Sequence, residues 1–79
     1  MFNNEKIARI AEIEEKWTIH FWYENNGCTM YKACRKYSKK DRHIFVMQTE
    51  KGYKCMNGQY WRYPAEAISE YLTMHCENI

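Results

Sequence analysis

The period of the hydrophobic pattern changes abruptly at residue 17 of this chain. Across residues 4–16, apolar side chains recur three or four positions apart, as at Ile7, Ile10 and Ile13, and this spacing forms one face of a helix. The next stretch, at residues 17–24, reads "WTIHFWYE", and its clearly apolar face consists of every second side chain, which is typical of a strand. We therefore predict a helix over residues 4–16 that leads directly into a strand.

Turn-forming residues divide the remainder of the chain into further strands and a second helix. The "NNG" at residues 25–27 contains Asn and Gly, which tolerate the positive φ of tight hairpins, so the next strand returns antiparallel to the first. Pro64 favours the start of a helix, because its missing N–H is not needed in the first turn. The predicted strands cover residues 17–24, 28–37, 43–49, 53–56 and 59–62, and the predicted second helix covers residues 64–76.

The order of these elements predicts an α+β fold, and a chain of 79 residues forms one domain. We expect an N-terminal helix, an antiparallel sheet of three to five strands and a C-terminal helix. Both helices should lie on one face of the sheet, which leaves the other face open to solvent or to a partner. The strand over residues 43–49 should be the most buried, because it contains four consecutive apolar residues.

The aromatic content exceeds what a small core can hide. Aromatic residues make up 16% of the chain, and they include three Trp and seven Tyr. Each ring can bury roughly 150–250 Å², and a chain of this length has a marginal core. Some of these rings should therefore lie at the surface, where they would suit a binding face.

Charge is distributed unevenly along the chain. The formal net charge is only +2, which by itself does not indicate a nucleic-acid partner. Residues 31–43, "YKACRKYSKKDRH", contain six Lys or Arg and one Asp, whereas residues 64–79 contain three Glu and no Lys or Arg. The chain therefore has a basic middle and an acidic end.

Which side chains of the second strand face outward depends on the loop at residues 25–27, because a slip of one residue exchanges the two faces of a strand. A three-residue loop places Tyr31 beside Phe21 on the core side and leaves Lys32 outside. A two- or four-residue loop places Tyr31 outside instead. The sequence leaves this choice open, but Trp22 is exposed next to basic groups in both cases.

The candidate contact residues are basic and aromatic side chains of this region and of the segment "QYWRYP". Aromatic rings and cations bind bases and phosphates, and Trp, Tyr and Arg are also the usual hot-spot residues of protein interfaces. The candidates are Trp22, Tyr31, Lys32, Arg35, Lys36, Tyr37, Lys39, Lys40, Arg42, Trp61 and Arg62. The alternative is a solvated edge strand, in which Lys residues block aggregation.

The sequence shows no standard metal or cofactor site, and we expect neither. Cys28 and Cys34 would lie about 20 Å apart on one strand, too far for a single ion. Cys55 and Cys76 have no close partner in the sequence, and no Gly-rich phosphate loop, paired carboxylates or cofactor fingerprint can be identified. Because there is no secretory signal, the four cysteines should be reduced thiols.

His43 gives one alternative with catalytic chemistry. It begins a strand beside Arg42, so it could act as a general acid–base group in a small ribonuclease, with cations binding the phosphate. In element order, and in a strand-borne His before an aromatic residue, the chain resembles the HicA-type mRNA toxins. Their Gly-Ser-His signature is absent, because Asp41 and Arg42 occupy those places. No family is assigned on this resemblance.

These features together predict a small, non-enzymatic binding protein. The longest apolar run is four residues, far short of the roughly 20 that span a bilayer, so we expect a cytoplasmic monomer or homodimer without membrane contact. Its partner should be a larger protein or a protein–nucleic-acid complex. Such a chain has the character of phage or mobile-element inhibitors of a host nucleic-acid machine, of which anti-CRISPR proteins are one group. The alternatives are a direct nucleic-acid-binding regulator and a ribonuclease-type toxin that uses His43.

Overall fold

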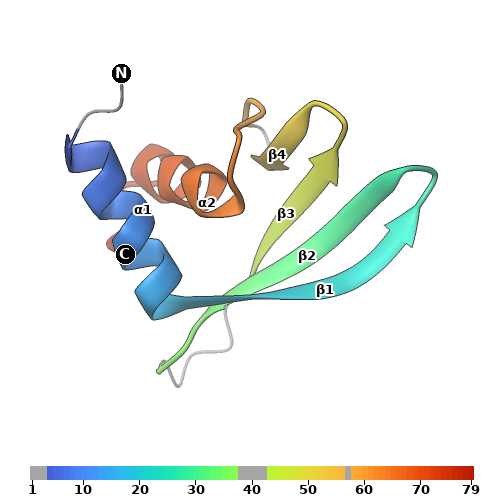
Figure 1. The fold of residues 1–79 in the computed structure, drawn as a ribbon. Helices are drawn as coiled ribbons and strands as arrows, with labels where there is room; N and C mark the ends of the chain where they lie inside the picture. The colour runs from blue at the N-terminus through green and yellow to red at the C-terminus, as the bar shows by residue number, and fades with distance from the viewer. Residues whose placement is uncertain (1–3, 38–42, 57) are drawn as a thin grey trace.

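A computed structural model describes residues 4–37, 43–56 and 58–79 of the chain. Its elements are α1 (Asn4–Lys16), β1 (Trp17–Asn25), β2 (Cys28–Arg35), β3 (Ile44–Thr49), β4 (Gly52–Cys55) and α2 (Pro64–Met74), as Figure 1 shows. The four strands form one sheet in the order β1-β2-β3-β4, and each strand is antiparallel to its neighbours. The predicted α+β fold is therefore confirmed.

The predicted strand over residues 59–62 is wrong, because this segment forms only a single bridge to the sheet. The N–H groups of Tyr53 and Trp61 each donate to the carbonyl of the other residue, at 2.8 and 2.6 Å. Close approach is possible here because Gly52 has a φ of +124° and a Cβ at that position would lie 2.5 Å from the Trp61 carbonyl oxygen. The pairing stops after Trp61, because the N–H of Arg62 donates to the Glu66 carboxylate at the start of α2 instead.

A β-bulge in β1 sets the register of the first hairpin. The loop has two residues, Asn26 and Gly27, whose φ angles of 51° and 78° fit the tight turn that Asn-Gly favours. A regular two-residue hairpin would pair Tyr31 with Trp22, but Trp22 is the extra residue of a bulge, and Tyr31 lies opposite Phe21. The pairing expected for a three-residue loop is thus present, although the extra residue lies in the strand. The expectation that a two-residue loop places Tyr31 outside is wrong.

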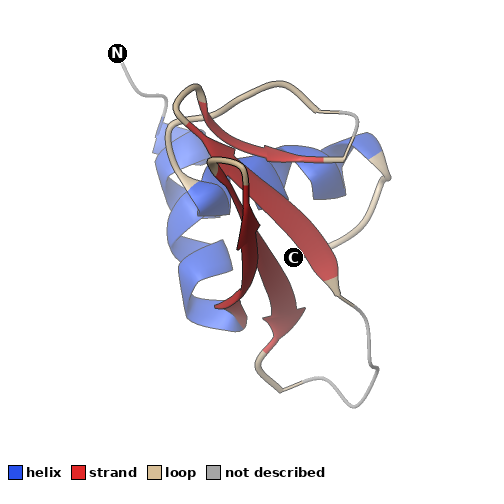
Figure 2. Cartoon of the chain, turned by 90° about the vertical axis from the view of Figure 1, so that its right-hand side faces the viewer, coloured by secondary structure: helices blue, strands red, loops and turns tan. Residues whose placement is uncertain are grey.

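Both helices cover the same face of the sheet. The core is one cluster that includes residues of both helices and alternate residues of the strands, namely Ile13, Trp17, Ala33, Ile44, Val46, Cys55, Ala65, Ala67, Ile68 and Leu72. The four sheet residues among them share a face, since Ala33 lies opposite Ile44 and Val46 lies opposite Cys55. Figure 2 shows the two helices on this side of the sheet. Neither helix covers the other side, which we call the open face.

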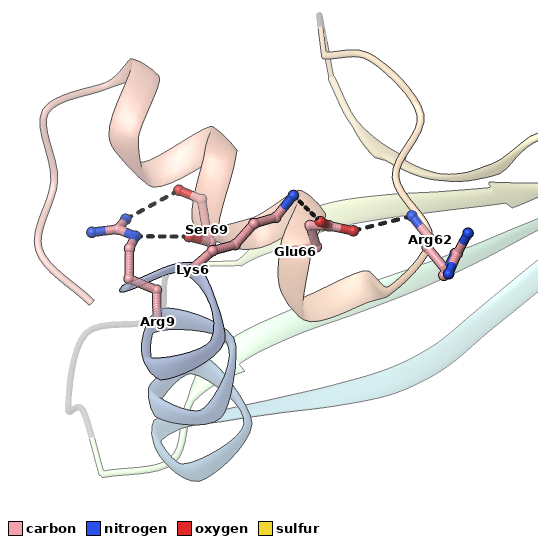
Figure 3. A network of polar contacts seen from close by, with 5 residues as sticks. All are labelled: Lys6, Arg9, Arg62, Glu66 and Ser69. Atoms are coloured by element: carbon pink, nitrogen blue, oxygen red, sulfur yellow. Dashed lines mark hydrogen bonds and ion pairs between the residues drawn. The ribbon is translucent and has the colours of Figure 1, made fainter. Parts of the chain in front are cut away.

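Polar contacts hold α1 against α2, as Figure 3 shows. The Lys6 ammonium lies 2.5 Å from the buried Glu66 carboxylate. The Arg9 guanidinium donates to the hydroxyls of Ser69 and Thr73, at 3.0 and 2.8 Å. Because the side of α1 that carries these residues faces α2, Ile7 is left 49% exposed although it belongs to the predicted helical stripe.

Candidate functional site

The open face combines aromatic, thioether and basic side chains. Cross-strand pairing places Lys32 beside Phe45, Met30 beside Met47, and Met47 beside Lys54. These residues alternate with the core residues of the same strands, so their side chains point away from the helices. The open face comprises His20, Trp22, Tyr23, Met30, Lys32, Phe45, Met47, Lys54 and Met56.

Trp22 lies at the centre of an aromatic cluster on this face. The bulge in β1 places its ring 5.1 Å from the ring of Phe45, at a tilt of 32°. The Lys32 ammonium lies 4.3 Å from the centre of the Trp22 ring, and the ring of Tyr23 meets it edge-on. A cation over Trp is the most favourable form of cation–π contact. Trp22 nevertheless remains 44% exposed, so the cluster has surface left for a partner.

An apolar hollow lies in the open face over β2, β3 and β4. Its volume is about 360 Å³, and its lining consists of Met30, Phe45, Met47, Lys54, Cys55 and Met56. Methionine side chains are flexible and polarisable, so they adapt to apolar groups of different shapes. The charged group of the lining is the Lys54 ammonium, which lies 4.9 Å from the ring centre of Tyr60. The hollow can therefore accept an apolar side chain that has a carboxylate near it.

The positive charge of the open face is not neutralised by the described part of the chain. In that part, one ion pair joins Lys6 of α1 to Glu66 of α2, and the other joins Lys16 to Glu12 within α1. Lys32 and Lys54 form no ion pair with a described carboxylate, and each ammonium lies over an aromatic ring instead. Both charges are therefore available to an acidic partner.

The structure does not place Tyr31 and Arg35 on the open face. Tyr31 lies half-buried on the helix side, and its hydroxyl donates to the amide oxygen of Gln48 at 2.7 Å. Arg35 lies 4.8 Å above the Trp17 ring and donates to the carbonyl of Asn78 at 2.7 Å. Both side chains have contacts within the fold and are separated from Trp22 by the sheet.

Two of the predicted candidates that follow β2, Lys36 and Tyr37, are also separate from the aromatic cluster. Lys36 is exposed, and its N–H donates to the carbonyl of Lys16 at 2.9 Å. Tyr37 is 91% exposed. Lys39, Lys40 and Arg42 lie outside the described residues. The exposed side chains at this end of β2 are near the junction of α1 with β1, whereas Trp22 is near the hairpin turn.

Trp61 and Arg62 belong to the segment that leads into α2. Trp61 packs partly buried against the core, and the Lys6 ammonium lies 4.8 Å from its ring centre. Arg62 has an exposed side chain, and its backbone N–H donates to Glu66. Of the predicted candidates that the structure describes, only Trp22 and Lys32 therefore lie together on the open face.

Sequence reasoning missed the part of the surface that β3 and β4 contribute. β3 has two buried residues, Ile44 and Val46, more than any other strand, as its apolar run predicts, but Phe45 between them is 40% exposed. Every second side chain of a strand must point outward when helices cover only one face of its sheet. Applied to the predicted layers, this rule would have placed Phe45 or its neighbours in the open face.

The described residues contain no group of three or more His, Cys, Asp or Glu that could hold a metal ion. Cys28, Cys34, Cys55 and Cys76 form no disulfide. Burial raises the pKa of the Cys55 thiol to about 12, so it is protonated near neutral pH and is a poor nucleophile.

His43, the candidate of the ribonuclease alternative, is exposed immediately before β3, and its neighbours at 41 and 42 are outside the described residues.

Comparisons with protein families, curated proteins and solved structures give no match for this chain. In the described part of the chain, neither helix is long and apolar enough to cross a membrane. The geometry and charge of the open face are therefore the basis for a functional proposal.

Proposed function

We propose that this chain is a non-enzymatic binding protein whose open face binds an acidic surface of another protein. The observation that carries the proposal is the apolar hollow, which Lys54 lines and beside which Lys32 lies opposite Phe45. Neither lysine has a described carboxylate partner. Beside the hollow, Trp22 stacks on Phe45 and keeps exposed surface. Trp and Met are enriched in protein interfaces, where a few such anchors supply most of the binding free energy.

The contacts of Trp22 favour a protein partner over a nucleic acid. Single-stranded nucleic acids stack their bases on aromatic rings whose faces are free. The ring of Trp22 already contacts Lys32, Phe45 and Tyr23 of its own chain. Thioether side chains dominate the hollow and offer no donors to phosphate. Direct nucleic-acid binding remains the second candidate, because the two lysines could also bind phosphates.

In this proposal the partner belongs to a larger nucleic-acid-processing assembly of a host cell, and binding of this chain inhibits that assembly. The small size of the chain and the combination of basic and aromatic residues on one surface support this. A phage or mobile-element origin and an anti-CRISPR-like role follow the same reasoning. Occupation of the partner surface would be sufficient for inhibition, without any chemical step.

Site-specific crosslinking tests which face binds. A photoreactive amino acid at Met56, which is 71% exposed at the hollow, should crosslink a protein partner in the host cell. The same group at Ile7 of α1 should not, and Lys32→Glu should abolish the Met56 crosslink while Lys16→Glu on α1 leaves it intact. Equal crosslinking from both positions, or no effect of Lys32→Glu, would contradict the proposal.

A titration with labelled oligonucleotides separates the two candidates. Nucleic-acid binding should weaken steeply between about 50 and 200 mM salt, because each neutralised phosphate releases counterions. If the protein binds single- or double-stranded oligonucleotides with this salt dependence, and Lys32→Glu removes the binding, the second candidate is supported instead.

A further inference from the structure

We propose that the segment bound by the open face is an acidic helix of the partner, with one large apolar side chain in the hollow. Its carboxylates lie four residues before and four residues after this apolar anchor. This inference rests on the proposed function and specifies the ligand of the same surface.

The position of the hollow favours a helix over an extended segment. Its sheet residues come from β2, β3 and the edge strand β4, and the free side of β4 is already bridged to Trp61 through Tyr53. The backbone groups of β2 and β3 are paired with strands on both sides, so a segment that lies on this face finds no backbone partner there. A helix satisfies its own backbone hydrogen bonds internally and can present side chains to the face.

The positions of the two lysines define the spacing of the carboxylates. Lys32 on β2 lies opposite Phe45, and Lys54 on β4 lies opposite Met47. The lysines are thus two strands and two residues apart, which corresponds to about 12 Å between their Cα atoms at a strand spacing of about 4.8 Å and a rise of about 3.4 Å per residue. Two helical residues eight positions apart are also separated by about 12 Å.

The anchor position follows from the same arrangement. Phe45 and Met47 lie on β3, between the strands that carry the two lysines, and both line the hollow. An apolar side chain midway between the two carboxylates of the helix therefore lies over the hollow. Because residues i−4, i and i+4 share one helix face, all three side chains can contact the sheet together.

The lysines are held in position before the partner arrives. The Lys32 ammonium lies 4.3 Å from the ring centre of Trp22, and that of Lys54 lies 4.9 Å from the ring centre of Tyr60. A cation over a ring retains its charge, and its N–H donors that point away from the ring can still bind a carboxylate. Because these side chains are already restrained, they lose less conformational freedom on binding than free lysines would.

Three synthetic peptides with the same composition test the inference by isothermal titration calorimetry. The first is an Ala/Gln-based helix with a central Leu and Glu at the positions four before and four after it. The second moves both Glu residues to positions two away from Leu, where they face a different side of the helix. All three peptides contain two Pro in place of two Gln. The first two peptides have the Pro residues at their ends, and the third has them near its centre, where they prevent the helix.

We expect the first peptide to bind about tenfold more tightly than the other two, since two partly exposed ion pairs supply roughly this factor. The double variant K32Q/K54Q should lose the preference, and the control Lys16→Gln should keep it, with circular dichroism used to verify that each variant is folded. Equal binding of the first two peptides, or tighter binding of the third, would overturn the inference. If no peptide binds, the inference is also overturned, and crosslinking from Met56 decides the proposed function separately.

Discussion

The Nζ atom of Lys6 in α1 lies 2.5 Å from Oε2 of Glu66 in the first turn of α2. The other oxygen of this carboxylate accepts the N–H of Arg62 at 3.2 Å, so one buried side chain both begins α2 and joins it to α1. A carboxylate near a helix N-terminus is also favoured by the helix dipole. Glu66 therefore contributes to stability through three separate interactions.

Replacement of Glu66 should destabilise the fold. We expect Glu66→Ala to lower the free energy of unfolding by about 2–3 kcal/mol, because it leaves the Arg62 N–H without its acceptor and removes the charge pair. Glu66→Gln can still accept this N–H and should cost about 1–2 kcal/mol. Urea unfolding followed by Trp fluorescence measures both values. Glu70→Gln, on the same helix, should change stability by less than about 0.5 kcal/mol, and an equal loss there would contradict this account.

The bulge at Trp22 gives a prediction about deletions. Deletion of Trp22 leaves every observed cross-strand pair between β1 and β2 in place, so it should cost only the lost ring contacts, about 1–2 kcal/mol. Deletion of Ile19 can also remove the bulge, but only if Trp22 pairs with Tyr31, and this shift moves His20 opposite the buried Ala33. It should cost more than about 3 kcal/mol. Thermal unfolding of the two deletion variants compares them, and similar losses would show that the bulge does not set the register.

Tyr31 should act in stability and not in binding at the open face. Tyr31→Phe removes the hydroxyl that donates to Gln48, which should lower the free energy of unfolding by about 1 kcal/mol. The crosslink from Met56 and the affinity for the first peptide should be unchanged, because the ring lies on the helix side of the sheet. A selective loss of either, with stability intact, would show that Tyr31 takes part in binding.

Cys55 should reduce stability at alkaline pH. Burial raises the pKa of its thiol from 9.0 to about 12, so between these values the thiol ionises in the unfolded chain while it stays protonated in the folded one. The unfolded state then binds fewer protons, and the free energy of unfolding falls as pH rises through this range. Urea unfolding of the wild type and of Cys55→Ala at several pH values measures the effect. The wild type should lose more stability than the variant, and parallel curves would contradict the assignment.

The element order could be predicted because local signals are strong. The helix predicted over residues 4–16 coincides with Asn4–Lys16, and Pro64 begins the second helix as expected. The second helix ends at Met74, two residues earlier than predicted, where Cys76 adopts a positive φ of 54° and the N–H of Glu77 returns to the carbonyl of Leu72. Such a chain reversal depends on a few backbone angles that the apolar periodicity does not report.

The faces of the first hairpin could not be predicted, because the deciding residue is not in the loop. "NNG" predicts a tight turn, and Asn26 and Gly27 form one. A two-residue turn alone would have placed Tyr31 outside, and nothing in the local sequence marks Trp22 as the bulged residue. The bulge is instead stabilised by tertiary contacts, since it allows Ala33 to enter the core and the Trp22 ring to meet Phe45.

The helix pairing also determines when this protein can finish folding during its synthesis. α1 is synthesised before α2, but Ile13 of α1 belongs to the same core cluster as Ile68 and Leu72 of α2. Each pair of neighbouring strands in the sheet is consecutive in sequence and can form quickly, whereas α1 must wait for a contact with a distant part of the sequence. The nascent chain therefore cannot bury the apolar side of its sheet completely until α2 has been made.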